Sequence, residues 1–116
     1  AAVSLAGFTL ETLDERPKAG VIDNRLRVEI QTSRFVVADL TGNNPGAYWE
    51  GGFAEGLSKP VFYTCDKAQF DIERTHFDAN HLYTVVWKFD QLQTAADELK
   101  NAIRATLPDE AKMTDE

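Results

Sequence analysis

The sequence predicts an α/β sandwich around a mostly parallel sheet. Apolar runs rich in β-branched residues recur along the chain, and they are continuous rather than alternating, as is typical of strands covered on both faces. Segments of helical periodicity fall between them. Alternation of strand and helix favours a parallel sheet with helices on both sides.

The expected strands lie at residues 8–13, 35–38, 61–64 and 84–87. The first alternates apolar and polar residues until the polar cluster at 14–17 ends it. The run at 35–38 is continuous and predicts a central strand. The last two runs predict further buried strands.

The expected helices lie at residues 21–32, 47–57 and 91–107. The first shows an apolar residue every fourth position. The second follows a Gly/Asn turn, and Pro45 suits its first turn. Asp90 is expected to cap the third, Pro108 to end it, and Leu92 to begin its apolar face. The polar tail at 108–116 is expected to be mobile.

Length and charge restrict the class of protein. The 116 residues fit one domain of roughly 100–150 residues, here 1–107. A net charge of −7 argues against nucleic acid as a partner, and no apolar run is long enough to span a membrane. One cysteine and no signal peptide predict a cytoplasmic protein. The opening apolar residues suggest the end of a helix that begins before this sequence.

Glu50 is a carboxylate on the apolar side of its expected helix. At about 100° per residue it lies within about 40° of Ala54 and Leu57, whereas Glu55 lies about 140° away where solvent is expected. An inward carboxylate is costly unless it is paired or faces a wet cleft. Helix starts at the carboxyl edge of a parallel sheet provide such clefts. A capping-box role for Glu50 is the alternative.

Asp39 ends the strand at 35–38, at the same expected edge. Alone, such an aspartate often only fixes the following turn. Together with Glu50 it forms a pair of carboxylates, which is the requirement for glycosyl transfer.

A second polar cluster lies at residues 75–81. Two histidines there, His76 and His81, lack a third ligand at usual spacing, so no metal site is expected. The cluster is either a ligand-binding loop or a surface loop. Aromatic residues such as Trp49 and Trp87 are expected in the core or an interface rather than as a stacking platform.

The segments at 33–43 and 48–61 resemble the nucleoside 2-deoxyribosyltransferase-like superfamily. The shared pattern is an apolar strand ending in an acid and Thr, an Asn/Gly loop, an aromatic-Glu-x-Gly-x-Ala helix start and a Lys-Pro-Val entry to the next strand. The resemblance implies a flavodoxin-like fold, no cofactor, and cleavage or transfer at the N-glycosidic bond of a nucleoside or nucleotide. It also implies a homo-oligomer, a dimer or larger.

In this resemblance Glu50 matches the nucleophile, and Asp39 matches a position that carries an acid. Gly51 replaces the usual Leu, and the strand that supplies a tyrosine and glycines in the family does not precede Phe8. The expected substrate-binding residues are Thr41, Gly42, Asn43, Gly46, Asp78 and Asn80. Asp39 or Asp78 would assist departure of the base.

Two other functions remain open. One is a TIR-like domain that cleaves NAD, which also uses a glutamate on a helix. The other is a nucleotide-binding or regulatory module without turnover, which the difference at Gly51 favours.

Overall fold

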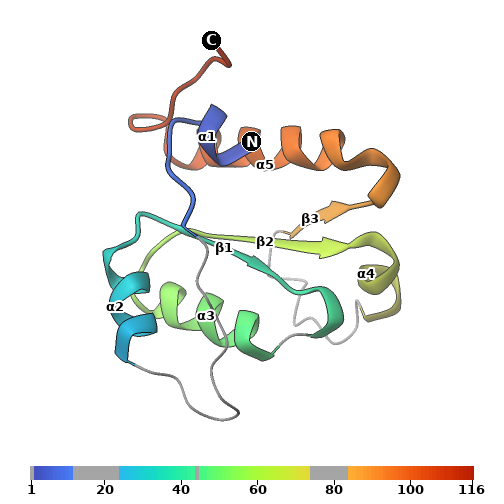
Figure 1. Ribbon diagram of the computed structural model, residues 1–116, viewed down its shortest axis with the longest axis horizontal. Helices are drawn as coiled ribbons and strands as arrows, with labels where there is room; N and C mark the ends of the chain where they lie inside the picture. The colour runs from blue at the N-terminus through green and yellow to red at the C-terminus, as the bar shows by residue number, and fades with distance from the viewer. Residues whose placement is uncertain (1, 12–23, 44, 74–83) are drawn as a thin grey trace.

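The computed structural model describes residues 2–11, 24–43, 45–73 and 84–116. They form an α/β sandwich whose sheet is entirely parallel, with helices on both faces (Figure 1). The predicted fold class is therefore confirmed. No helix within these ranges is both long and apolar enough to cross a bilayer.

The sheet contains β1 (Val36–Asp39), β2 (Val61–Asp66) and β3 (Thr84–Trp87), in the order β1-β2-β3. These strands confirm the three later predictions. However, β2 is central, and β1 lies at the edge of the sheet that the described residues form. Val36 and Ala38 are nevertheless buried. The continuous apolar run correctly predicted that both faces of β1 are covered. Covered faces do not determine whether a strand has one neighbouring strand or two, so the run could not predict that β1 lies at an edge.

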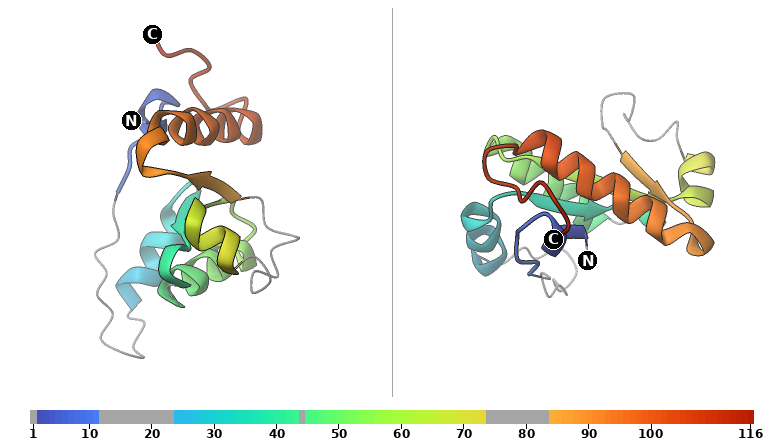
Figure 2. Two further views of the ribbon diagram at one scale, coloured as in Figure 1. Left: turned by 90° about the vertical axis from the view of Figure 1, so that its right-hand side faces the viewer. Right: turned by 90° about the horizontal axis from the view of Figure 1, so that it is seen from above.

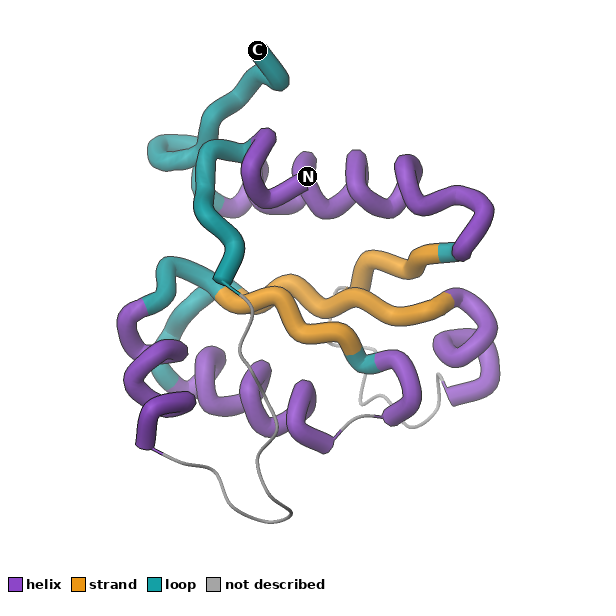
Figure 3. Tube along the Cα trace, in the orientation of Figure 1, coloured by secondary structure: helices purple, strands orange, loops and turns teal. Residues whose placement is uncertain are grey.

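Within the described residues, helices cover both faces of the sheet. Helices α2 (Asn24–Thr32) and α3 (Pro45–Gly56) lie on one side, and α1 (Ala2–Leu5) and α5 (Leu92–Thr106) lie on the other (Figures 1 and 2). Short helix α4 (Lys67–Glu73) follows β2 directly and was not predicted. Both sandwich layers are visible along the tube in Figure 3.

Alternating positions of the strands fill the two layers of the core. Ala38, Tyr63 and Cys65 pack with Ala47 on the α3 side. Val37 and Phe62 pack with Ile103, Val3 and Ala6 on the α5 side. The rings of Phe8, Phe35 and Phe62 continue this second layer through edge-to-face contacts.

The strand expected at residues 8–13 is wrong for its described part. Residues 8–11 are irregular, and the rest lies outside the described residues. The Phe8 ring meets Phe35 at a centroid distance of 5.0 Å, but Leu10 is 63% exposed. Phe8 is anchored in the core, but the alternating apolar residues that follow it do not form the buried face of a strand.

The final helix begins differently from the prediction. Asp90 lies within the 3-10 helix η3 (Phe89–Gln91), and Gln91 occupies the N-cap of α5 without a side-chain hydrogen bond. Leu92 is 51% exposed and does not belong to the buried face. The extra turn moves the start of α5 beyond Asp90. The helix ends at Thr106, before Pro108, as predicted.

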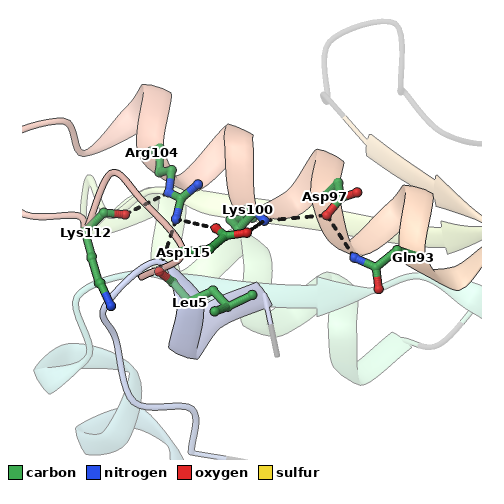
Figure 4. A network of polar contacts seen from close by, with 7 residues as sticks. All are labelled: Leu5, Gln93, Asp97, Lys100, Arg104, Lys112 and Asp115. Atoms are coloured by element: carbon green, nitrogen blue, oxygen red, sulfur yellow. Dashed lines mark hydrogen bonds and ion pairs between the residues drawn. The ribbon is translucent and has the colours of Figure 1, made fainter.

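The carboxyl-terminal tail, which the sequence predicts to be mobile, makes specific contacts with α5 and with the residue that follows α1. Asp115 accepts hydrogen bonds from Lys100 and Arg104, each at 2.9 Å (Figure 4). The Lys112 N–H donates to the Ala6 carbonyl at 2.7 Å, and Ala111 is buried. The prediction of mobility rested on the polar composition of the tail, and composition does not reveal these specific partners.

Candidate functional site

Asp39 lies at the carboxyl end of β1 and joins all three strands of the sheet. Its Oδ2 accepts hydrogen bonds from Thr64 Oγ1 of β2 at 2.6 Å and from Trp87 Nε1 of β3 at 2.9 Å. Its Oδ1 accepts from the Thr41 N–H at 2.9 Å. The last bond confirms the turn-fixing role that the sequence offered as the alternative, and the first two were not predicted.

These hydrogen bonds keep Asp39 ionised. Partial burial acts to raise the pKa of this carboxyl, but the bonds from Thr41, Thr64 and Trp87 together outweigh burial and lower the pKa below its ordinary value. A carboxylate in this state is a good hydrogen-bond acceptor and a poor proton donor at neutral pH.

The turn after Asp39 is held to the neighbouring strand. Thr41 Oγ1 accepts a hydrogen bond from the Asp66 N–H at 2.8 Å, and the Leu40 N–H donates to the Thr64 carbonyl at 2.8 Å. Thr41 belongs to the 3-10 helix η1 (Thr41–Asn43). Gly42 within it has φ of 76°, a conformation that favours glycine. Asp39, Thr41 and Gly42 thus lie together in the turn at the carboxyl end of β1.

Asp39 and Glu50 belong to opposite sides of the sheet. Asp39 continues the row of Val37, and Thr64 continues the row of Phe62, which both face α5. Glu50 instead lies on α3, which covers the other face. The two candidate acids share the carboxyl edge but do not project from the same layer.

Glu50 lies in the second turn of α3 and is half-buried. The buried stripe of this helix consists of Ala47, Gly51 and Ala54, whereas Leu57, expected on the stripe, is 40% exposed. Glu50 therefore borders the stripe instead of lying at its centre. It is neither freely exposed nor sealed in the core.

The side chain of Tyr63, on β2, explains why position 51 of α3 is a glycine. A Cβ added at Gly51 would lie 2.6 Å from the Tyr63 hydroxyl oxygen and 2.8 Å from its Cε1. The Tyr63 hydroxyl donates a hydrogen bond to Glu55 Oε2. Burial, together with that bond and the charge of Glu55, raises the pKa of Tyr63. Glu55 is exposed as predicted, but it serves as a partner for a buried phenol.

The remaining expected site residues divide into two groups. Gly46 is in the first turn of α3 and Asn43 ends η1, so both backbones lie at the carboxyl edge. Asp78 and Asn80 lie outside the described residues, as do both histidines. Within the described ranges, no group of three or more acidic, histidine or cysteine residues could hold a metal ion.

Thr64 and Trp87 are the site residues that sequence reasoning missed. Both were assigned to buried strands, and Trp87 was expected in the core or an interface. The signal that could have found them is position, because Thr64, Trp87 and Asp39 all lie at or near the carboxyl ends of predicted strands. Aligning the three predicted parallel strands at their carboxyl ends would have placed these residues close together.

The chain matches no family model, no curated protein and no solved structure in the three comparisons made.

Proposed function

We propose that this protein cleaves or transfers the N-glycosidic bond of a nucleoside or nucleotide, with Glu50 as the nucleophile. The observation that carries the proposal is the half-buried position of Glu50 in the second turn of a twelve-residue helix that starts at the carboxyl edge of the sheet. Ligands of parallel α/β sheets bind at that edge. A carboxylate at such a boundary is reachable by a ligand while being partly shielded from water.

The proposed reaction forms a bond between a Glu50 oxygen and the anomeric carbon. The bond from that carbon to the base nitrogen breaks, and its electron pair leaves with the base, which takes up a proton. Water or a second base then attacks the glycosyl-enzyme and releases Glu50.

Asp39 has a positioning role in this proposal. Its low pKa makes it unsuitable as the acid that protonates the departing base at neutral pH. As an anion it holds Thr64 and Trp87 at the edge of the sheet. Asp78 stays the candidate for the acid.

A nucleoside or nucleotide is the proposed partner, without a cofactor, and the proposed setting is a cytoplasmic homo-oligomer. These points follow from the resemblance and from the composition of the chain.

The experiment measures release of free base. The protein is incubated with deoxynucleosides, nucleoside monophosphates and NAD, and the products are separated by chromatography. We expect Glu50→Gln to lower the rate by about three orders of magnitude or more, because the nucleophile is lost. Glu55→Gln on the same helix is the control and should retain most activity. Release from NAD alone would identify the TIR-like reaction, and no release from any substrate would refute the enzymatic proposal.

A non-catalytic nucleotide-binding module is the second candidate. The observation that favours it is Asp39, whose carboxylate accepts three hydrogen bonds and offers no proton. Thermal stabilisation by nucleoside monophosphates that persists in Glu50→Gln, without base release in either protein, would establish this function.

A further inference from the structure

Arg104, in the last turn of α5, binds both ends of the chain (Figure 4). Its Nε donates to the Lys112 carbonyl at 2.7 Å. Its Nη2 donates to the Leu5 carbonyl at 3.2 Å and to Asp115 Oδ1 at 2.9 Å. The Arg104 side chain is only 12% exposed. One guanidinium therefore joins α5 to the last residue of α1 and to two positions of the carboxyl-terminal tail.

The tail and the residues that follow α1 also contact each other directly. The Lys112 N–H donates to the Ala6 carbonyl at 2.7 Å. Gly7 has φ of 92°, and a Cβ added there would lie 3.0 Å from Lys112 Cβ and 3.1 Å from its backbone nitrogen. Ala111 of the tail is buried in one apolar cluster with Val3 and Ala6. The two ends of the described chain are thus packed against each other as well as against α5.

Two further contacts hold the tail in place. Lys100 Nζ donates to Asp115 Oδ2 at 2.9 Å, and the Lys100 side chain is only 9% exposed. Arg34 pairs with Glu110 at 2.6 Å, but these side chains are 47% and 46% exposed, and ion pairs at such sites contribute little to stability. The attachment of the tail therefore rests mainly on the carboxylate of Asp115 and the two shielded cations of α5.

The segment formed by residues 2–7 and the tail buries little apolar surface of its own. Its buried apolar residues are all small: Ala2, Val3, Ala6 and Ala111. Helix α1 has four residues, which are too few for a helix that is stable without tertiary packing. Regions with few buried apolar contacts open at a lower free energy than the whole domain. Loss of the tail should therefore also release α1.

We propose that residues 2–7 and the tail form one clasp, which opens and closes on α5 as a unit while the sheet stays folded. In the closed state, the carboxylate of Asp115 neutralises Lys100 and Arg104. Opening returns both cations to solvent and uncovers the face of α5 that the clasp protects. This inference does not depend on the proposed enzymatic function, because the clasp lies on α5 and Glu50 lies on α3, across the sheet.

Native-state hydrogen exchange tests the clasp at single amides. The Ala6 and Phe8 amides donate to carbonyls within α1, so they report on this helix rather than on the tail. We expect Asp115→Asn to speed their exchange by about 10-fold to 150-fold, the effect of losing a hydrogen bond to a charged group. The Lys112 amide should be accelerated by the same factor. Asp109→Asn, on an exposed acid of the tail, is the control and should leave all three amides at the wild-type rate.

Arg104→Lys is the second variant. Lysine keeps the positive charge but lacks the planar fork that reaches both chain ends at once. We expect the amides of Ala6, Phe8 and Lys112 to be accelerated together in this protein as well. The amides within β2 provide the internal reference, and they should keep their wild-type rates in both variants.

Three results would overturn the clasp. Faster exchange at Lys112 with Ala6 and Phe8 unchanged would show that the tail opens alone. Equal acceleration of the β2 amides would show that the whole domain unfolds instead. Wild-type rates at every amide of Asp115→Asn, or α1 amides that already exchange in the wild type as fast as those of an unstructured peptide, would show that Asp115 does not hold α1.

Discussion

The indole of Trp87 and the carboxylate of Asp39 are hydrogen-bonded across β2, although they belong to the strands on either side of it. Thr64 donates to the same carboxylate oxygen from β2 itself. One ionised oxygen therefore ties the carboxyl ends of three strands together. We expect this edge to be rigid because the bonds to a charged acceptor are stronger than bonds between neutral groups.

Asp39→Asn should destabilise the protein by about 1–3 kcal/mol at pH 7, the typical contribution of hydrogen bonds to a charged group. The amide replaces an acceptor oxygen with a donor that faces Thr64 or Trp87. Urea unfolding measures the free energy of unfolding. Asp90→Asn is the matched control on an exposed acid, and an equal loss in both variants would contradict a special role for Asp39.

The stabilisation from Asp39 should depend on pH in one direction. Its pKa is lower in the folded protein than the ordinary 3.8, so the contribution is complete above that value. It is lost as pH falls through the lowered pKa. The difference in unfolding free energy between wild type and Asp39→Asn should therefore shrink below about pH 4. A difference that is constant from pH 7 to pH 2 would show that the charge is irrelevant.

Gly51→Ala should destabilise the protein by about 1–3 kcal/mol, because the new methyl group overlaps the Tyr63 ring. Gly52→Ala is the matched control, since a Cβ there meets nothing within 4 Å. It should stabilise α3 by about 0.5–1 kcal/mol through helix propensity. Thermal unfolding of both variants checks the opposite signs. Equal shifts in the two variants would refute the close approach of Tyr63.

Tyr63 should stay protonated at pH values where an ordinary phenol ionises. Burial and the bond to Glu55 raise its pKa, so its contribution to stability persists below pH 10 and is lost when pH rises through the raised value. Absorbance near 295 nm, titrated in wild type and Tyr63→Phe, isolates this group. Glu55→Gln should bring its ionisation to lower pH, and an unchanged titration in that variant would contradict the assignment.

Asp115→Asn should release the tail from α5. Asp115 pairs with Lys100 and Arg104, and the Lys100 side chain is only 9% exposed. The hydrogen bonds from both cations lower the pKa of Asp115, so the attachment should also weaken as pH falls through that pKa. Hydrogen exchange of the Lys112 amide measures release. Asp109→Asn, on an exposed acid of the same tail, should leave that exchange slow.

The sequence predicted the parallel sheet because buried strands at 35–38, 61–64 and 84–87 are visible as continuous apolar runs. It also correctly placed Asp39 at the carboxyl edge of the sheet, because the turn residues that follow Asp39 mark the end of the strand. It could not show that Asp39 faces α5 while Glu50 lies on α3, since this depends on strand register and on which face each helix covers. It also missed α4, whose seven residues are too few for a clear helical period.

Glu50 illustrates the limit of a helical wheel. The wheel placed it near Leu57 on an apolar stripe, but Leu57 is exposed and the buried stripe consists of Ala47, Gly51 and Ala54. A glycine contributes no apolar side chain to a periodic pattern. The sequence pattern therefore did not show that the buried face extends to Gly51, against which Tyr63 packs.

The return of residues 107–115 to α1 has a consequence for biosynthesis. Ala6 and Lys112 are hydrogen-bonded although more than a hundred residues of chain separate them, so the segment that contains α1 is translated well before this partner. At about 5–20 residues per second, that interval lasts about 5–20 seconds. During it, the apolar side chains of α1 lack the cover that the tail later supplies, and this helix is where a nascent chain would need protection by a chaperone.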